Sequence, residues 1–396
     1  NETTQMIHSA RMNSETIVVT WQCPETTSGH AIVGQINGTA MSWGQMVTFT
    51  ASDVMYPQVN KVSDNTFVIV YTDRDNTNKG TAIIGQINGT DITLGTSSVF
   101  NDATTNYPKA TRLSDTKIVV TYRDEDDSGN QQTIVADING YSMTWGAEST
   151  LNTQQAGISS IQAMSGTKFV VSYSDPQNNT IGTAVVGEVS GTSISLGNEY
   201  TVNAQTSNHQ LTKLSDDRFI LTYRDDTDNY QGKALVGNIS GTTITFGAPA
   251  IFCDLTNTRT TFSLYDDDKL LVNYQTSVIP TMYLKTGSIS GNTISFEAAS
   301  PSTWGVFENA EMSVLTLYDN KWLMVAGVEA GTILMYQKPV YVIGIAASSG
   351  SGSNGDSVNV VYSGIVSGLD DLIEGQAYYA DENGNLTTTV TDRYLG

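Results

Sequence analysis

Basic residues are scarce in this sequence. Its 396 residues include 19 Lys and Arg against 40 Asp and Glu, which gives a formal net charge of −21 at pH 7. A surface of this sign repels the phosphates of nucleic acids and the headgroups of anionic lipids. We therefore expect no nucleic acid and no membrane among the partners of this protein.

Cysteine, histidine and long apolar runs are rare as well. Cys23 and Cys253 are far apart in the sequence, so no disulfide can be deduced and two isolated thiols are expected. His8, His30 and His209 have no metal-ligand spacing and no serine or cysteine motif beside them, which favours structural roles. No apolar run approaches the roughly 20 residues of a transmembrane helix.

The sequence does contain one unit that is repeated along most of its length. In the clearest copy, residues 113–146, an alternating strand over 117–122 is followed by an acidic loop and a second strand over 133–138. Asn139-Gly140 then predicts a tight hairpin turn into a strand over 142–145. Residues 107–113 alternate too, so the unit is predicted to be a four-stranded antiparallel meander.

Two markers of this unit recur in phase. The anchor residues at the end of the second strand are spaced 50 to 52 residues apart: Trp21, Tyr71, Tyr122, Tyr173, Tyr223, Tyr274 and Ala326. The hairpin turns keep the same period: Asn37-Gly38, Asn88-Gly89, Asn139-Gly140, Ser190-Gly191, Ser240-Gly241 and Ser290-Gly291. Seven such units predict an all-β fold, a seven-bladed β-propeller over residues 1–346.

The first and last blades are less regular than the others. In blade one we expect the fourth strand over residues 41–48. In blade seven, Lys338-Pro339 stands where the hairpin should be, so the fourth strand must come from elsewhere. It is formed either by residues 340–346 or by a segment near the N-terminus, and the former is favoured because few residues precede Ser9.

The composition changes after residue 346. Residues 347–356 form a Gly/Ser linker, and short alternating segments over 357–396 predict a small C-terminal β module. The module stops at Gly396 without a closing strand. We expect it to continue further or to be completed by a neighbouring chain, which allows for a homo-oligomer.

This tail contains several short motifs in a fixed order: Ser357-Val358-Asn359-Val360, Gly364-Ile365-Val366, Gly368-Leu369, Gly375-Gln376-Ala377-Tyr378-Tyr379 and Asn383-Gly384-Asn385-Leu386-Thr387-Thr388. In these motifs the tail resembles the C-terminal modules of tailed-bacteriophage virion proteins. In those proteins a Thr-Pro-Gly turn usually follows the leucine, whereas residues 370–375 intervene here. The repeated blade pattern is similar to propeller repeats of the same kind of protein.

The resemblance implies a non-enzymatic virion surface protein of tail-fibre, appendage or decoration type. Its tail would dock onto other virion proteins, and its propeller would contact a host surface glycan or protein, so the expected location is the virion surface or the extracellular space. The alternative is a secreted bacterial propeller that binds carbohydrate or hydrolyses glycosides.

A propeller built from such meanders has two faces that differ in loop length and in charge. The loops from second to third strand, and from fourth strand to the next blade, emerge together and carry most of the acid. Function usually lies in such variable loops. We expect Tyr56, Tyr107 and Tyr230 to lie there as ligand-binding residues.

The same loops offer carboxylates for a metal ion. Calcium is the possible cofactor, with the candidate ligands Asp73, Asp75, Asp124, Asp126, Asp225 and Asp228, because hard cations prefer several oxygen ligands. Alternatively, the aspartate two places after each anchor tyrosine accepts backbone N–H bonds as an ordinary turn residue.

We expect no catalysis. A glycosidase needs two carboxylates across a pocket, and a sialidase needs an arginine cluster with a nucleophilic tyrosine. Arg74, Arg123 and Arg224 recur at equivalent loop positions, which favours pairing with local acids over convergence on one anion. The anchor tyrosines are expected to pack between blades.

Overall fold

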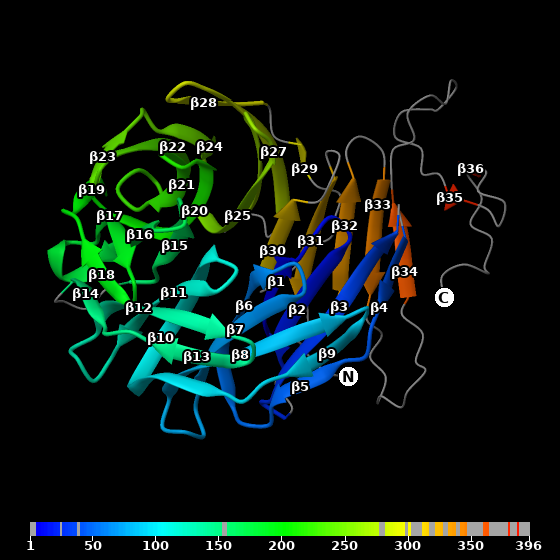
Figure 1. The fold of residues 1–396 in the computed structure, drawn as a ribbon. Coiled ribbons are helices and arrows are strands. Elements are labelled where there is room, and N and C mark those ends of the chain that lie inside the picture. Colours follow the sequence, from blue (N-terminus) through cyan, green and yellow to red (C-terminus); the bar gives the residue numbers. More distant parts are fainter. Residues whose placement is uncertain are drawn as a thin grey trace.

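The computed structural model describes residues 5–23, 26–37, 40–152, 157–276, 282–297, 300–301, 311–316, 321–327, 332–337, 341–346, 359–363, 379–380 and 386–387. These residues form seven antiparallel blades arranged around a ring (Figure 1). The protein is a seven-bladed β-propeller, as the repeat predicts. None of the described residues forms a helix long and apolar enough to cross a membrane.

Each blade has four strands that follow one another in the chain. The innermost are β1 (Gln5–Arg11), β6 (Val54–Ser63), the second half of β10 (Ser98–Ser114), β15 (Ser160–Ala163), β20 (Thr206–Ser215), β25 (Asn257–Asp266) and β30 (Glu311–Thr316). The second strands are β2 (Thr16–Gln22), β7 (Thr66–Asp73), β11 (Lys117–Asp124), β16 (Lys168–Asp175), β21 (Arg218–Asp225), β26 (Lys269–Thr276) and β31 (Lys321–Gly327).

The outer half of each blade is a hairpin. The third strands are β3 (Gly29–Asn37), β8 (Lys79–Asn88), β12 (Asn130–Asn139), β17 (Ile181–Ser190), β22 (Gln231–Ser240), β27 (Met282–Ser290) and β32 (Thr332–Gln337). The fourth strands are β4 (Ala40–Trp43), β9 (Asp91–Leu94), β13 (Ser142–Trp145), β18 (Ser193–Leu196), β23 (Thr243–Phe246), β28 (Thr293–Phe296) and β33 (Tyr341–Ala346). One 3-10 turn, η1 (Pro176–Asn178), follows β16.

The hairpin turns differ in one detail from the prediction. Asn88 pairs with Asp91 as a strand residue, so the two-residue turn is Gly89-Thr90 rather than Asn-Gly. Of these two, Gly89 has positive φ, which is the pattern of a type II′ turn. This explains why Ser190 can replace the asparagine before Gly191, because that residue needs no left-handed conformation.

In six blades a second, outer strand piece follows the fourth strand after a short break. In blade one a single unbroken strand over residues 41–48 was expected. In blade one, residues 44–46 separate β4 from β5 (Val47–Thr50), and both pieces pair with β3. The equivalent outer pieces are the first half of β10, β14 (Ser149–Asn152), β19 (Tyr200–Asn203), β24 (Ala250–Cys253) and β29 (Ser300–Pro301). The prediction of one strand over 41–48 was wrong because a glycine at the break packs against the next blade: a Cβ on Gly44 would collide with the carbonyl oxygen of Thr90.

The core lies between the blades. Second strands carry apolar residues on both faces, and Val68, Ile69 and Val70 of β7 are all fully buried. The anchor tyrosines pack there as predicted: Tyr71 meets Phe49 of blade one, with ring centroids 5.3 Å apart, and belongs to a cluster spanning blades one and two. Radial packing of this kind needs no disulfide, and Cys23 and Cys253 are both free and buried.

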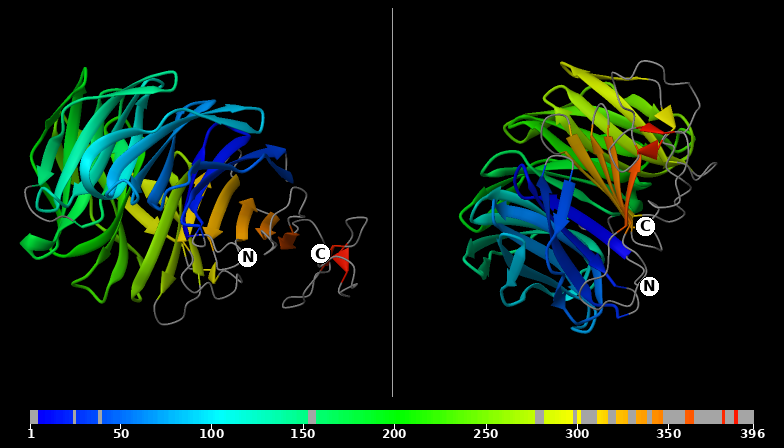
Figure 2. Two further views of the ribbon diagram at one scale, coloured as in Figure 1. Left: turned by 90° about the horizontal axis from the view of Figure 1, so that it is seen from below. Right: turned by 90° about the vertical axis from the view of Figure 1, so that its right-hand side faces the viewer.

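The ring closes by contact between blades one and seven. β1 contacts β30 and β31, and the blue and orange blades lie side by side in Figures 1 and 2. β33 pairs along its length with β32, so residues 341–346 supply the fourth strand of blade seven. The favoured sequence interpretation is confirmed, and the N-terminal alternative is wrong.

β34 (Asn359–Ser363) pairs with β33 at the outer edge of blade seven, although the sequence analysis assigns it to the C-terminal module. Beyond it, β35 (Tyr379–Ala380) pairs with β36 (Leu386–Thr387). The expected strand over 364–366 lies outside the described residues. The division of the chain at 347–356 stays a prediction.

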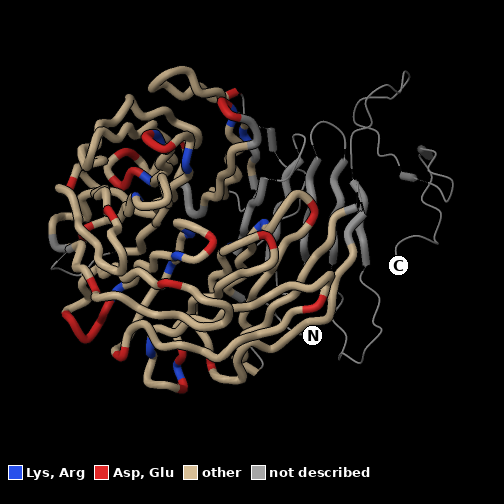
Figure 3. The backbone as a smooth tube through the Cα atoms, in the orientation of Figure 1, with Lys and Arg blue, Asp and Glu red and all other residues tan. Residues whose placement is uncertain are grey.

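The two loop types share one face, as predicted. The backbone N–H of Asp53, in the loop that enters blade two, donates to Asp75 in the loop between β7 and β8. The N–H of Arg74 donates back to the carbonyl of Asp53. In Figure 3 charged residues gather in loops and at strand ends, while most of each strand is uncharged. We call the side of the propeller on which both loop types lie the loop face.

Candidate functional site

The innermost strands carry a bulge near the loop face. In blade two the pairing passes from Met55 with Thr72 to Gln58 with Val70, so Tyr56 and Pro57 together oppose the single residue Tyr71. The first bulge residue is left-handed in four blades: Met6 (φ 55°), Tyr56 (54°), Tyr107 (52°) and Asn208 (55°). An extra residue of this kind bends the strand and changes the direction in which the side chain of the bulge residue points.

These bulges store strain. A side chain in the left-handed region costs about 1 to 3 kcal/mol, and such positions cluster at functional sites. In blades two and three the second bulge residue is Pro57 or Pro108, which loses no ladder hydrogen bond because a bulge residue is unpaired. Met6 and Tyr56 are also connected directly, since the Tyr56 N–H lies 3.1 Å from the Met6 sulfur.

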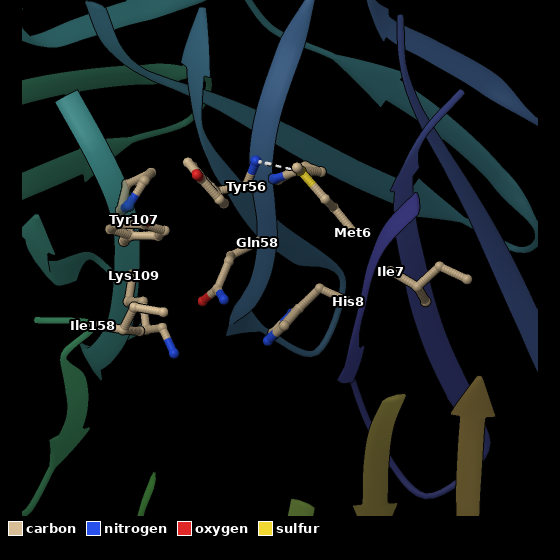
Figure 4. Close-up of a pocket in the computed structure, with 10 residues that line it drawn as sticks. Met6, Ile7, His8, Tyr56, Gln58, Tyr107, Lys109 and Ile158 are labelled. Carbon is tan, nitrogen blue, oxygen red and sulfur yellow. Dashed lines mark hydrogen bonds between the residues drawn. The ribbon is translucent and has the colours of Figure 1, made fainter. Parts of the chain in front are cut away.

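The bulges of neighbouring blades surround a pocket of about 230 Å³. We call it the bulge pocket. Its lining consists of Met6, Ile7, His8, Tyr56, Pro57, Gln58, Tyr107, Pro108, Lys109 and Ile158 (Figure 4). At roughly 30 Å³ per water molecule, this volume equals about eight waters. It is smaller than the sites of drug-sized ligands, which suits a single small ring or group.

An aromatic pair forms one wall of the bulge pocket. The rings of Tyr56 and Tyr107 lie 4.5 Å apart at an angle of 46°. Burial, followed by the Tyr107 hydroxyl, raises the pKa of Tyr56 well above its usual value, so the phenol stays neutral. The guanidinium of Arg123 lies 5.1 Å from the centre of the Tyr107 ring, a cation–π contact that holds the ring in place.

Polar groups from three inner strands form the other wall. His8, Gln58 and Lys109 come from β1, β6 and β10, and their side chains point toward one another in Figure 4. Burial lowers the pKa of Lys109 to about 8, which leaves it mostly charged at neutral pH. Burial and the nearby Lys109 ammonium lower the pKa of His8 to about 4, so this imidazole is neutral.

Two of the three predicted ligand residues therefore meet, and the third does not. Tyr230 lies in the loop between β21 and β22, where its ring packs against Arg224 at 5.1 Å from the guanidinium carbon. It remains 46% exposed and is absent from the pocket lining. A role for Tyr230 in ligand binding stays a prediction.

The six candidate metal ligands already have hydrogen-bond or ion-pair partners on the protein. Asp73 accepts the backbone N–H of Asn76, Asp124 accepts those of Asp126 and Asp127, and Asp225 accepts that of Thr227. Asp75 and Asp126 accept N–H groups of the neighbouring entry loops, and Asp228 pairs with Lys233. Among the described residues, no three His, Cys, Asp or Glu side chains are grouped to hold a metal ion.

These bonds predict the outcome of calcium addition. Because each of the six carboxylates already has a hydrogen-bond or ion-pair partner on the protein, calcium and EDTA should both leave the melting temperature of the purified protein unchanged. Differential scanning fluorimetry measures this directly, with magnesium as the ionic-strength control. A calcium-specific rise in melting temperature would establish the metal hypothesis instead.

The recurring arginines and two histidines have the structural roles expected of them. Arg74 pairs with Asp53 at 2.9 Å, Arg123 with Glu125, and Arg224 with Asp226 at 2.6 Å. His30 contacts the hydroxyls of Ser28 and Thr48, and His209 contacts those of Ser172 and Thr206. His8 differs, because it lines the bulge pocket and its buried Nδ1 has no hydrogen-bond partner among the described residues.

Sequence reasoning missed His8, Gln58 and Lys109 as site residues. One sequence signal could have found Gln58 and Lys109. Tyr-Pro occurs twice at equivalent positions, 56–57 and 107–108, inside segments that otherwise read as strands. Proline within a strand indicates an edge or a bulge. Both Tyr-Pro pairs line the pocket, and so do the residues that follow them, Gln58 and Lys109.

Several solved structures are similar to this chain at the level of the fold. The BP39L lectin from Burkholderia pseudomallei is 8% identical with a TM-score of 0.60, over 88% of this chain and 98% of the lectin. The β-propeller domain of the trilobed protease from Pyrococcus furiosus is 8% identical with a TM-score of 0.51, over 88% and 96%. A prolyl endopeptidase is 9% identical with a TM-score of 0.54, over 97% of this chain and 52% of that chain, so this chain spans about half its length.

No family model matches the chain, and no curated protein matches it significantly. At these identities the structural matches establish the β-propeller fold and nothing about function.

Proposed function

We propose that this protein binds carbohydrate in the bulge pocket and does not cleave it. The observation that carries the proposal is the wall formed by Tyr56 and Tyr107 opposite polar side chains. Aromatic faces pack against the apolar faces of a sugar ring, while amide and imidazole groups can bond its hydroxyls. A lectin among the similar folds supports the proposal by analogy only.

Binding is favoured over hydrolysis by the chemistry of the lining. Glycoside hydrolysis generally requires two carboxylates that flank the bond to be cleaved. The described lining of the bulge pocket holds no Asp or Glu. Host attachment by a virion is the setting that the C-terminal resemblance implies, and a host glycan would then be the ligand; docking onto other virion proteins remains part of that proposal.

The proposal is tested with the purified full chain on a glycan array, beside a hydrolysis assay on the same glycans. Binding without turnover is the expected result. Release of any sugar at a steady catalytic rate would favour the hydrolytic alternative, and a protein that binds no glycan would end the proposal.

Tyr107→Ala should weaken glycan binding by roughly 10-fold or more, because alanine removes the stacking wall and the contact with Arg123. Isothermal titration with the best array ligand measures the change. The control is Tyr141→Ala, since Tyr141 is 36% exposed in a hairpin turn away from the pocket lining. Equal affinities for both variants would show that the tyrosine pair does not contact the ligand.

A further inference from the structure

The bulge pocket carries positive charge in a protein that is strongly acidic. Lys109 lines the pocket in a chain whose formal net charge is −21. Ten other lysines and arginines form ion pairs with Asp or Glu, such as Lys61 with Asp64 at 2.6 Å. The side-chain ammonium of Lys109 has neither an ion pair nor a hydrogen bond with any residue that the structure describes.

The described residues that line the pocket offer no counter-charge to Lys109. His8 and Tyr56 are neutral at pH 7, and the Gln58 amide carries no charge. Lys109 is partly buried. Partial burial of an ammonium without a counter-charge is unfavourable, and the usual solution is a paired anion with further hydrogen bonds. The unpartnered Nδ1 of His8 is a second polar atom in the same lining whose hydrogen-bond capacity is unused.

We propose that the bulge pocket selects an anionic saccharide, one whose carboxylate or sulfate group pairs with Lys109 while its ring packs on Tyr56 and Tyr107. This inference rests on the proposed function and narrows its ligand class. The pocket volume of about 230 Å³ admits one acidic sugar unit, so the rest of a longer glycan would lie outside the pocket. The Gln58 amide donates to the same anionic group or to a neighbouring hydroxyl.

The test compares matched glycans on the intact protein. Glucuronate-containing and sulfated oligosaccharides are titrated beside neutral oligosaccharides of the same backbone, with binding measured by calorimetry. The acidic members should bind roughly 10- to 100-fold more tightly, the factor expected for one charge-assisted hydrogen bond. The two acidic series distinguish a carboxylate ligand from a sulfate ligand.

Variants at Lys109 test whether its charge causes the preference for acidic glycans. Lys109→Met should abolish the preference while keeping affinity for neutral glycans, and Lys109→Arg should retain the preference. Lys61→Met is the control, because Lys61 lies on the neighbouring inner strand but pairs with Asp64 away from the pocket. If Lys109→Met does not fold, Lys109→Gln provides the same comparison.

Each result has a definite meaning. A preference for acidic glycans that survives in Lys109→Met or Lys109→Gln overturns the inference. Equal binding of neutral and acidic glycans by the unaltered protein also overturns it, yet leaves carbohydrate binding intact. If no glycan of either kind binds, the proposed function fails and the inference fails with it.

Discussion

Asp225→Asn is expected to lower the free energy of unfolding by about 2 to 3 kcal/mol at pH 7. Asp225 is 3% exposed at the end of β21. One oxygen accepts from Lys233 at 2.8 Å and from Asn203 at 2.6 Å, and the other accepts the N–H and hydroxyl of Thr227. An asparagine in this place provides only one acceptor oxygen and leaves Lys233 with Asp228 as its remaining counter-charge.

The loss should depend on pH with a defined sign. Burial alone would raise the pKa of Asp225, but the bonds from Lys233, Thr227 and Asn203 outweigh it and lower the pKa to about 2. The carboxylate therefore contributes stability that is fully present above its ordinary pKa near 4 and is lost as the pH falls through 2. The difference between the two proteins should shrink accordingly below about pH 4.

Urea denaturation at pH 7, 5 and 3 measures this difference. Asp216→Asn is the matched control, since Asp216 forms a similar 2.6 Å ion pair with Lys213 but its side chain is 77% exposed. Its removal should cost less than about 1 kcal/mol at every pH. A loss for Asp225→Asn that is no larger than the control, or that persists unchanged in acid, would contradict the assigned role.

Gly146→Ala should destabilise the protein by about 2 to 3 kcal/mol, because it forces two blades apart. Gly146 lies at the break in the outer strand of blade three. A Cβ there would collide with the carbonyl oxygen of Thr192, in the hairpin turn of blade four. That oxygen belongs to the backbone, so a side-chain rotation cannot relieve the clash. The same contact recurs between Gly247 and the carbonyl of Asn292.

Gly166→Ala is the control for this substitution. The nearest atom to its added Cβ, the Leu113 carbonyl oxygen, lies 3.9 Å away, so no clash arises. Alanine should be neutral or slightly stabilising there, since it reduces the freedom of the unfolded chain. Melting temperatures compare the two variants. If Gly146→Ala has the same melting temperature as Gly166→Ala, the glycine at the outer break is not needed for contact between blades.

Much of the fold could be predicted because its signals are local. Strands such as Lys117–Asp124 consist of β-branched and aromatic residues, and Gly89 and Gly140 occupy turns that require positive φ. Seven in-phase copies of the anchor residue then leave few architectures that can bury both faces of each sheet. The breaks in the outer strands escaped prediction because a glycine such as Gly44 meets its partner only in the next blade.

The candidate site was predicted only in part. Tyr56 and Tyr107 were expected at the loop face, yet their contact could not be anticipated, since 51 residues separate them in the chain. His8 and Lys109 are farther apart still, and each alone reads as an isolated polar residue in a strand. The bulges in β1, β6 and β10 bend these neighbouring inner strands, and their side chains then line the bulge pocket together.

The amino-acid sequence by itself determined the all-β class, the blade number and the unlike faces, because strand alternation and turn chemistry depend on near neighbours. Only the tertiary structure decided that an aromatic pair, a neutral histidine and a lysine without an ion pair among the described residues line one pocket. Those residues belong to different repeats, and their proximity follows from ring closure and inner-strand bulges rather than from any sequence spacing.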